Sequence, residues 1–280
     1  MPSESADALQ LAKSLVEHIR TSYYKVVVAF SGGVDSAVVA AAAYRALGTN
    51  AIAWTSIGAA MPQADQLDAQ RVAQSIGIDH VRIPTSEIEN PDYIANGPDR
   101  CFHCKSTLYA AISKWAREHD FETILSGTNA EDLGDYRPGL QAAANWGVQA
   151  PLADLLYTKD NVRSIAKLWS LEVADKPASP CLASRIAYGQ VVTIGRLGRI
   201  EAMEKWLNSE GLSDVRARLH ADDLLRLEIH LHQLPEAVCE PMRSRIVSKA
   251  TELGFRYVTI DIQGRQSGSL NRVLTDAQKG

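Results

Sequence analysis

The stretch Lys25-Val26-Val27-Val28-Ala29-Phe30-Ser31-Gly32-Gly33-Val34-Asp35-Ser36 decides the fold of this chain. It begins with a short continuous run of mostly β-branched residues, which is typical of a strand buried on both faces of a parallel sheet. Two adjacent glycines follow the strand, and a helix rich in alanine and valine then continues to Leu47. A strand, a tight turn and a helix in this order predict the first βα unit of an α/β domain.

The alternation of strands and helices continues after this unit. We predict strands at residues 51–57, 80–83 and 122–126, helices at residues 5–20, 63–76 and 107–119, and a loop at residues 90–100. This order predicts a doubly wound parallel sheet with helices on both faces. Ligands of such sheets bind at the carboxyl ends of the strands, where the loops at residues 31–36, 56–61 and 127–139 are expected.

A second, smaller α+β domain is predicted at the C-terminal end. The pattern there is a helix (194–210), two strands (214–219 and 224–230), a mostly helical stretch (234–253) and a strand (255–262). The chain has 280 residues, a length that favours about two domains. We therefore expect an α/β domain over residues 1–188 and an α+β domain over residues 189–280.

The composition is that of a globular protein, with 46% hydrophobic and 22% charged residues. The formal net charge of −4 argues against a broad basic surface for nucleic acid, although it allows a local basic pocket. No apolar run reaches the ~20 residues that a membrane-spanning helix needs, and no secretion signal is visible. We therefore expect a cytoplasmic protein that has no membrane segment.

The glycine turn is suited to phosphate. Gly32 and Gly33 let the backbone approach a ligand, and the following helix start offers free N–H groups and the positive end of its dipole. The turn is not the dinucleotide pattern G-x-G-x-x-G, and it lacks the Gly-Lys-Ser/Thr of the Walker loop. The alternative from the residues alone is an ordinary tight βα turn without a ligand.

Three of the four cysteines have the spacing of a metal or redox site. Cys101 and Cys104, with two residues between them, lie before a predicted helix, and Cys181 follows much later. Three thiolates can bind three irons of a 4Fe–4S cluster, whereas a zinc site needs a fourth ligand such as His103. The spacing leaves these two sites equal, and a redox pair or unrelated thiols are further alternatives. Cys239, in an apolar helical neighbourhood, is predicted to be a core residue.

Four arginines stand in or near motifs of this acidic chain, at positions 137, 185, 216 and 218. Arg216 and Arg218 lie on one face of the predicted strand, because alternate residues of a strand point the same way. Two guanidinium groups on one face are suited to phosphate. The alternative is a solvated strand face.

The sequence S-G-G-V-D-S after a hydrophobic strand resembles the PP-loop of the N-type ATP pyrophosphatases. That family cleaves ATP to AMP and pyrophosphate and adenylates its substrate. The resemblance implies that the loop holds the pyrophosphate end of ATP together with Mg²⁺, and that the strand end at residues 53–56, with Ser56, lies beside the adenine. The loop residues implied are Ser31, Gly32, Gly33, Asp35 and Ser36.

Three further stretches, at residues 127–139, 177–189 and 258–264, make the chain similar to the LarE family of ATP-dependent sulfur transferases. The resemblance implies that a carboxylate of pyridinium-3,5-biscarboxylic acid mononucleotide is adenylated, and that sulfur then displaces AMP to leave a thiocarboxylate. The product serves nickel-pincer nucleotide synthesis. By this resemblance, nucleotide or phosphate contacts also fall on Gly127, Asn129, Asp132, Arg137, Arg185, Arg216 and Arg218.

The family has a single-cysteine type, which gives up its own sulfur, and a three-cysteine type, which holds a 4Fe–4S cluster whose open iron carries sulfide. Cys101, Cys104 and Cys181 match the three-cysteine type, so the resemblance implies a cluster and a catalytic role for these thiols. It also implies a homo-oligomer, whereas the sulfide donor is not predicted. After Gly264 the sequence departs from the family pattern of an aromatic residue and then arginine, which leaves Arg265 without a predicted role.

Two other functions compete with sulfur transfer to this nucleotide. A PP-loop enzyme of tRNA thiolation can use a similar three-cysteine cluster, but the acidic charge and the lack of Lys/Arg tracts count against tRNA binding. A non-catalytic nucleotide sensor with a structural zinc ion is the third hypothesis, and the complete PP-loop counts against it.

Overall fold

The computed structural model describes residues 2–134, 138–177, 179–266 and 268–275. The chain forms two compact units: Met1–Glu87 with Cys101–Ser179, and Ile88–Arg100 with Pro180–Gly280. The chain therefore passes from one unit to the other after Glu87, after Arg100 and after Ser179. The domain boundary near residue 188 stays a prediction.

The first unit contains a four-stranded sheet in the order β3-β2-β1-β4, and all pairs of neighbouring strands are parallel. Its strands are β1 (Val26–Ala29), β2 (Ala51–Ile57), β3 (Asp79–Pro84) and β4 (Thr123–Leu125). Val27 of β1 pairs with Ile52 on one side and with Ile124 on the other. β1 is thus an interior strand, and the predicted α/β fold is confirmed.

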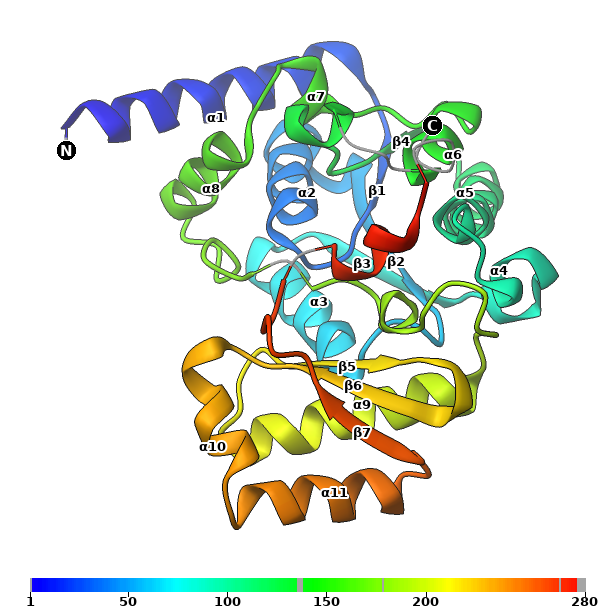
Figure 1. The fold of residues 1–280 in the computed structure, drawn as a ribbon. Helices are drawn as coiled ribbons and strands as arrows, with labels where there is room; N and C mark the ends of the chain where they lie inside the picture. The colour runs from blue at the N-terminus through cyan, green and yellow to red at the C-terminus, as the bar shows by residue number, and fades with distance from the viewer. Residues whose placement is uncertain (1, 135–137, 178, 267, 276–280) are drawn as a thin grey trace. The chain divides into compact units, whose positions relative to one another are not determined.

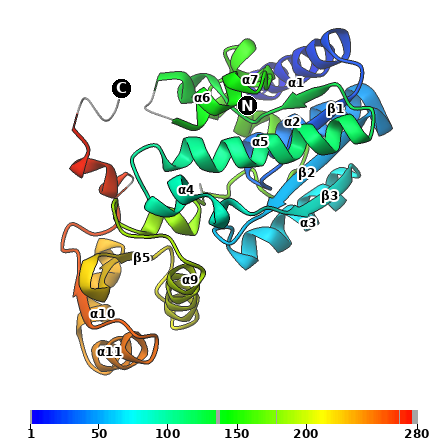
Figure 2. The same ribbon diagram turned by 90° about the vertical axis from the view of Figure 1, so that its right-hand side faces the viewer.

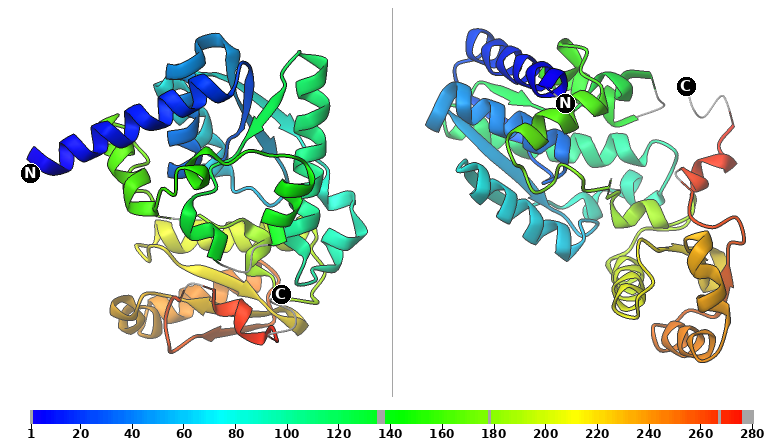
Figure 3. Two further views of the ribbon diagram at one scale, coloured as in Figure 1. Left: turned by 90° about the horizontal axis from the view of Figure 1, so that it is seen from above. Right: turned by 90° about the vertical axis from the view of Figure 1, so that its left-hand side faces the viewer.

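Helices cover both faces of this sheet (Figures 1 and 2). One core joins Val26 and Val28 to α1 (Pro2–Ser22), α2 (Val34–Leu47), α3 (Gln63–Ile76) and α8 (Lys159–Leu168). The other core joins Val27 to α5 (Arg100–Glu118) and α6 (Pro138–Asn145). The short α7 (Pro151–Asp154) adds further apolar contacts, and the N-terminal turns of α1 project beyond the sheet (Figure 3). All three valines have no exposed surface, which explains why the strand is a continuous apolar run.

The second unit is built on a three-stranded sheet in the order β5-β6-β7. Its elements are α4 (Pro91–Ala95), α9 (Ile194–Ser209), β5 (Arg216–Leu219), β6 (Leu224–Glu228), α10 (Leu234–Val238), α11 (Met242–Glu252) and β7 (Tyr257–Ile260). β5 and β6 are antiparallel, and β6 and β7 are parallel. Alternation along β5 buries Ala217 and Leu219, and it leaves Arg216 and Arg218 on the opposite face.

Two local predictions near the cysteines were wrong. The predicted loop at residues 90–100 contains α4, which the Asn90 side chain caps by accepting a hydrogen bond from the Asp92 amide at 2.9 Å. The helix predicted to begin at Thr107 begins at Arg100, so Cys101 and Cys104 lie in its first turns and not before it. The added turns contain one large apolar residue, Phe102, which packs against the core and is too isolated to give an apolar periodicity.

The prediction for Cys239 was also wrong, because its side chain is exposed. The helical stretch expected over residues 234–253 is two helices, and Cys239 lies in the break between them, before Pro241. Proline cannot donate a backbone hydrogen bond, so it ends the continuous helix that would have buried this side chain. No helix within the described ranges is both long and apolar enough to cross a membrane.

His80 provides a test of packing at β3, an edge strand of the sheet. Its Nε2 atom lies 2.7 Å from Thr55 Oγ1, and that hydroxyl donates to the Phe30 carbonyl at 2.7 Å. Burial, and then the positive charge of Arg82, lower the pKa of His80 to about 4. An unfolded histidine takes up its proton near pH ~6.5, so the free energy of unfolding should fall as the pH drops below that value toward 4.

We expect His80→Gln to remove about 1–2 kcal/mol of the stability loss between pH 7 and pH 5. Urea unfolding of both proteins at the two pH values measures this difference. His232→Gln, at an exposed position, should leave the pH dependence of the parent protein unchanged. Equal losses in the parent and in His80→Gln would show that His80 is not the acid-sensitive group.

Candidate active site

The loop after β1 has no room for a side chain at its first glycine. Gly32 has a φ of +72°, and a Cβ atom there would lie 2.7 Å from the Cα atom of Ala69 on α3. Gly33 is the N-cap of α2, and no side chain caps the helix there. The first amides of α2 are therefore available to a ligand, as an anion site at a helix N-terminus requires.

Two serines hold the loop in a fixed shape. The Ser36 hydroxyl accepts a hydrogen bond from the Ser31 amide at 3.2 Å and donates one to the Gly33 carbonyl at 3.1 Å. The two hydroxyl groups are 3.1 Å apart. These contacts tie the start of α2 to the end of β1, so the loop is ordered before a ligand binds.

The loop after β4 comes equally close to this turn. A Cβ atom on Gly127 would lie 2.7 Å from the Ser36 amide nitrogen and 2.9 Å from the Asp35 carbonyl carbon. Both contacts are with backbone atoms, which cannot rotate away as a side chain can. Glycine is therefore required at this position, where the loop after β4 lies against the first turn of α2.

Asp35 is the charged centre of the site. One carboxylate oxygen accepts a hydrogen bond from the Asn129 side-chain amide at 3.1 Å, and the other forms an ion pair with Lys159. Asn129 is only 3% exposed. Its backbone amide donates to Asp132 at 3.0 Å, and Glu131 accepts a hydrogen bond from the Lys159 amide at 2.8 Å. The structure thus gathers acidic, amide and cationic groups around the first turn of α2.

A cavity of about 330 Å³ opens beside these groups within the first unit. Its volume is in the range of small-molecule sites. The lining residues are Ala29, Ser31, Asp35, Ser36, Lys105, Tyr109, Ser126, Gly127, Thr128, Asp132, Gly139, Leu140 and Ala143. The cavity lies at the carboxyl ends of β1 and β4, the edge at which such sheets bind ligands.

Ser56 lies apart from the residues that line this cavity. Its hydroxyl contacts that of Thr85, which donates to the Glu87 carboxylate at 2.9 Å. Glu87 is 5% exposed, and its carboxylate packs so closely on Gly58 that a Cβ atom there would overlap it. The predicted place of Ser56 beside an adenine stays a prediction.

None of the three cysteines is in a disulfide bond, and they lie on two different units. Cys101 and Cys104 are three residues apart on α5, a spacing that puts side chains on the same helix face. Cys181 is exposed and is the N-cap residue of the short 3-10 helix Leu182–Arg185 in the second unit. Over the described residues, no three His, Cys, Asp or Glu side chains form a group that could hold a metal ion. The cluster site stays a prediction.

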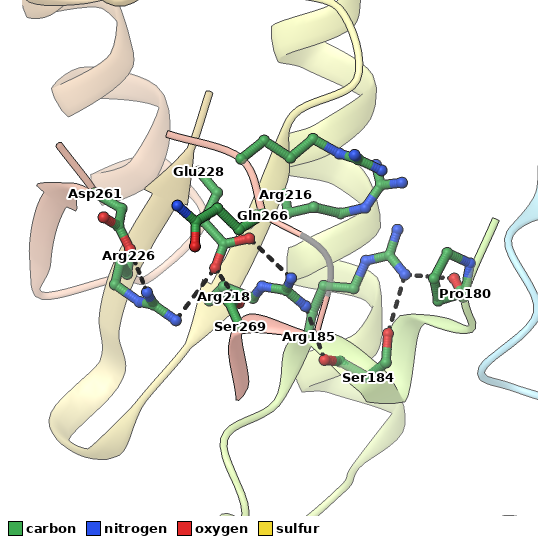
Figure 4. Close-up of polar contacts among 12 residues, drawn as sticks. Pro180, Ser184, Arg185, Arg216, Arg218, Arg226, Glu228, Asp261, Gln266 and Ser269 are labelled. Carbon is green, nitrogen blue, oxygen red and sulfur yellow. Dashed lines mark hydrogen bonds and ion pairs between the residues drawn. The ribbon is translucent and has the colours of Figure 1, made fainter. Parts of the chain in front are cut away.

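Arg185 in the second unit is fully occupied by protein groups, of which Figure 4 shows Pro180 and Ser184. Its Nε and Nη2 atoms donate to the two oxygens of Glu204 at 3.1 and 3.2 Å. Its Nη1 atom donates to the carbonyls of Pro180 and Cys181 and to the Ser184 hydroxyl. With 2% exposure, Arg185 holds the backbone around Cys181 and has no free edge for a phosphate.

Arg218 and Glu228 form a buried ion pair on the polar face of the second sheet (Figure 4). Arg218 donates to Glu228 at 2.8 Å and to the Ser184 carbonyl at 3.0 Å. Glu228 has no exposed surface and also accepts a hydrogen bond from Ser269 at 2.5 Å. The Arg218 Nε atom is buried without a hydrogen-bond partner among the described residues, so one donor is left to point at a ligand.

Arg216 has less compensation for its charge. Asp214 lies 3.1 Å from Arg216 and 3.0 Å from Arg265, so one carboxylate serves two guanidinium groups. Burial, and then the positive charges of Arg185 and Arg265, lower the pKa of Arg216. An anion bound here would relieve this repulsion.

Two further predictions for the arginines have different outcomes. The alternative of a solvated strand face does not hold for Arg218, which is 7% exposed. Arg137 lies outside the described residues.

Comparisons with known proteins agree with this geometry. Residues 8–183 match the family described as asparagine synthase. The chain is 33% identical over 259 residues to the pyridinium-3,5-bisthiocarboxylic acid mononucleotide synthase of Lactiplantibacillus plantarum, with 91% of each chain covered. This chain belongs to the LarE family of PP-loop proteins. Like other members of the LarE family, it is an enzyme that uses ATP.

Two other relatives of this LarE-family chain differ in how much of it they match. An uncharacterised protein of Synechocystis sp. is 40% identical over 95% of this chain and 100% of its own length. The tRNA-specific 2-thiouridylase MnmA of Rickettsia africae is 32% identical, but the match covers only 55% of this chain and 52% of the thiouridylase. The likeness to LarE extends over both units, whereas the likeness to the thiouridylase covers about half of the chain.

Sequence patterns missed two lysines of the LarE-family site. Lys159 follows Thr158, which caps α8 together with Asn161 in a capping box. That capping pattern was a usable signal for the helix, but nothing in it linked Lys159 to Asp35, which is far away in the sequence. Lys105 follows Cys104 directly and lines the cavity, and only the early start of α5 gives it that position.

The close approach of Gly127 to the phosphate loop gives a direct test of the ATP site in this LarE-family enzyme. We expect Gly127→Ala to lower the affinity for MgATP by about tenfold or more, because the added methyl group must displace backbone that presents the ligand-binding amides. Calorimetric titration with MgATP measures this change. Gly198→Ala on α9, where a Cβ atom meets nothing within 4 Å, is the matched control and should bind as the parent does. Unchanged affinity in Gly127→Ala would contradict the placement of ATP at this loop.

Proposed function

We propose that this enzyme adenylates a carboxylate of pyridinium-3,5-biscarboxylic acid mononucleotide and converts it to a thiocarboxylate, for nickel-pincer nucleotide synthesis. The observation that carries the proposal is the arrangement around Asp35: an ordered phosphate loop, two acidic groups and a lysine beside one cavity. It supports ATP chemistry on a chain that is similar to the bisthiocarboxylate synthase over 91% of its length.

In the first step a carboxylate oxygen of the substrate attacks the α-phosphorus of ATP. A bond forms between that oxygen and phosphorus, and the bond to the β-phosphate oxygen breaks, so that pyrophosphate leaves with the electron pair. The amides of Gly32, Gly33 and the first turn of α2 would hold the pyrophosphate, with Ser31 and Ser36 fixing the loop. Asp35 and Asp132 would orient Mg²⁺, which would neutralise phosphate charge.

Lys159 gives this step a second cation. It is paired with Asp35 in the structure, and Asp35 is the carboxylate that would turn to Mg²⁺ when MgATP binds. The ammonium group would then be released toward the phosphates and would stabilise the charge that develops on the leaving pyrophosphate. Asn129 keeps Asp35 in place from the other side.

In the second step sulfur attacks the acyl carbon of the adenylate. A carbon–sulfur bond forms, the bond from the acyl carbon to the phosphate oxygen breaks, and AMP leaves. Arg216 and Arg218 would hold the 5′-phosphate of the substrate, since each has charge or a donor that the protein does not satisfy. Arg185 would act by holding the backbone of Cys181.

Cys101, Cys104 and Cys181 would hold a 4Fe–4S cluster, which would supply an open iron to carry sulfide. The donors fit this group in kind: all three are cysteines outside any disulfide bond, and two of them share a face of α5. Their helix and turn are ordered by protein contacts without a bound metal. A homo-oligomer and a cytoplasmic location remain part of this proposal.

The likeness to the tRNA-specific 2-thiouridylases favours tRNA thiolation as the second candidate. The net charge of −4 and the limited coverage of that likeness argue against it. One experiment separates the two. Protein reconstituted anaerobically with iron and sulfide is incubated with ATP, Mg²⁺ and sulfide, and with either the biscarboxylate nucleotide or tRNA.

We expect mass spectrometry to show an oxygen-to-sulfur exchange in the nucleotide, together with AMP, and no thiolated tRNA. Cys181→Ala should lose the exchange and still release pyrophosphate from the first step, whereas Cys239→Ala, an exposed thiol outside the set, should behave as the parent does. Thiolated tRNA would favour the second candidate. AMP formation that does not depend on either substrate would contradict both.

Lys159 offers a separate test of the adenylation step. We expect Lys159→Met to lower kcat for AMP formation by about 100-fold with a smaller change in the KM for ATP, because its charge acts on the leaving group. Lys167→Met is the matched control on α8, since Lys167 is exposed and pairs with Asp175 at the surface. An equal loss in both variants, or a change confined to KM, would argue against this role.

A further inference from the structure

Arg265 follows a tight turn after β7 in the second unit. The Gly264 amide closes this turn by donating to the Asp261 carbonyl at 3.0 Å. Gly264 has a φ of +72°, and a Cβ atom there would lie 3.0 Å from the Ile229 carbonyl oxygen. The Arg265 amide donates a hydrogen bond to that same carbonyl at 3.1 Å. Backbone contacts therefore fix the point from which the Arg265 side chain extends.

The Arg265 guanidinium group shares its counter-ion with Arg216. Its Nε atom lies 3.0 Å from Asp214 Oδ1, and the Arg216 Nη1 atom lies 3.1 Å from the same oxygen. The other Asp214 oxygen lies 3.2 Å from His230 Nε2, so both oxygens of this carboxylate are in use. Over the described part of the chain, no second carboxylate forms an ion pair with either arginine. Two positive charges thus face one negative charge, and the excess attracts an anion.

Arg265 and Arg218 also carry hydrogen-bond donors that the protein does not use. Both Nε atoms are buried and have no acceptor among the described residues. The approach of Arg265 Nε to Asp214 is close enough for an ion pair, but its angle is not that of a hydrogen bond. Arg218, which extends from β5 beside Arg216 (Figure 4), is held by Glu228 through its Nη2 atom. A buried donor without an acceptor destabilises a protein, which a ligand that supplies the acceptor would offset.

A phosphate monoester fits this combination of charge and donors better than a diester does. A monoester has three terminal oxygens and a charge of about −1.5 to −2 at pH 7. A diester has two terminal oxygens and a single negative charge. Guanidinium groups donate to such oxygens in a planar fork, and each charge-assisted hydrogen bond is stronger than a neutral one. The third guanidinium group, Arg265, is therefore of most use to a ligand that has a third terminal oxygen.

We propose that Arg265 is a third phosphate contact beside Arg216 and Arg218, and that the three together select a phosphate monoester. The phosphate supplies the negative charge that Asp214 alone does not, and it accepts the hydrogen bonds of the unused Nε donors. That this phosphate belongs to the nucleotide substrate rests on the proposed function. Arg265 contributes binding and not chemistry, so its loss acts on affinity and not on the reacting carboxylate.

Equilibrium dialysis of the full chain against ribose 5-phosphate tests this site without ATP or turnover. We expect Arg265→Met to bind ribose 5-phosphate about tenfold more weakly than the parent, because a charge-assisted contact is lost. Ribose, which lacks the phosphate, should bind equally weakly to both proteins. Arg265→Lys keeps the charge but loses the planar fork, so its affinity should be intermediate. The methyl ester of ribose 5-phosphate, a diester, should bind the parent about tenfold more weakly than the monoester.

The matched control is Arg243→Met, which removes the same charge from an exposed position on α11 and should bind as the parent does. Circular dichroism and thermal melts identify any variant that fails to fold, and Arg265→Lys keeps the test decisive in that case. Equal affinity of the parent and Arg265→Met for ribose 5-phosphate would overturn the inference. A parent that does not prefer the phosphate to ribose, or the monoester to the diester, would overturn it as well.

Steady-state kinetics with the biscarboxylate nucleotide separates this inference from the proposed function. We expect Arg265→Met to raise the KM for the nucleotide about tenfold and to leave kcat for pyrophosphate release nearly unchanged. A chain that binds ribose 5-phosphate through Arg265 but releases no pyrophosphate with the nucleotide would retain the phosphate site and reject the proposed function. Pyrophosphate release with the same KM in the parent and in Arg265→Met would reject the role of Arg265 alone.

Discussion

The first unit depends on a steric constraint: the phosphate loop lies between two other pieces of backbone with no space for a Cβ atom. Gly32 touches α3 at Ala69, and Gly127 touches the first turn of α2 at Ser36. Because these are backbone contacts, the loop cannot relax when a ligand leaves or arrives. The amides are preorganised, and charge is brought to them by side chains on other segments, Lys159 and Asn129. The rigid phosphate loop and the charged and polar side chains around it thus come from separate segments of the sequence.

This separation explains what the sequence could reveal. β2 and α3 have the predicted bounds because β-branched runs, helical spacing and glycine punctuation are local signals. The pairing of Asp35 with Lys159 is set by packing of α8 on α2, which no local pattern encodes. The same holds for the early start of α5, where Phe102 is the one large apolar residue of the added turns and gives no periodicity. Chemistry at the glycine loop could be predicted, but its electrostatic partners could not.

The arginines also show what a sequence pattern cannot predict. Strand alternation placed Arg216 and Arg218 on one face, but it could not show which guanidinium charge is neutralised by a carboxylate of the protein and which is not. Glu204 and Glu228 lie on other elements and neutralise Arg185 and Arg218, while Arg216 shares Asp214 with Arg265. Loss of one partner of a buried pair costs about 3–5 kcal/mol, since it strands the other charge. The acids therefore leave Arg216 with a shared carboxylate and Arg218 with one Nε donor, unsatisfied among the described residues, for an anion.

The proposed cluster would take its three cysteine ligands from two separate segments of the chain. Ordering two segments costs more conformational entropy than ordering ligands that all lie on one helix. Cys101 and Cys104 are ordered by α5 itself, whereas Cys181 is ordered only if its turn is held. Without Arg185, the cost of ordering that turn would fall on binding of the proposed cluster. Polar contacts suit this task because their directionality selects one backbone position, and apolar contacts would tolerate several. Asn96 shows the same use of polar contacts: it is the left-handed C-cap of α4, a conformation that asparagine tolerates, and its buried amide is satisfied by three carbonyls.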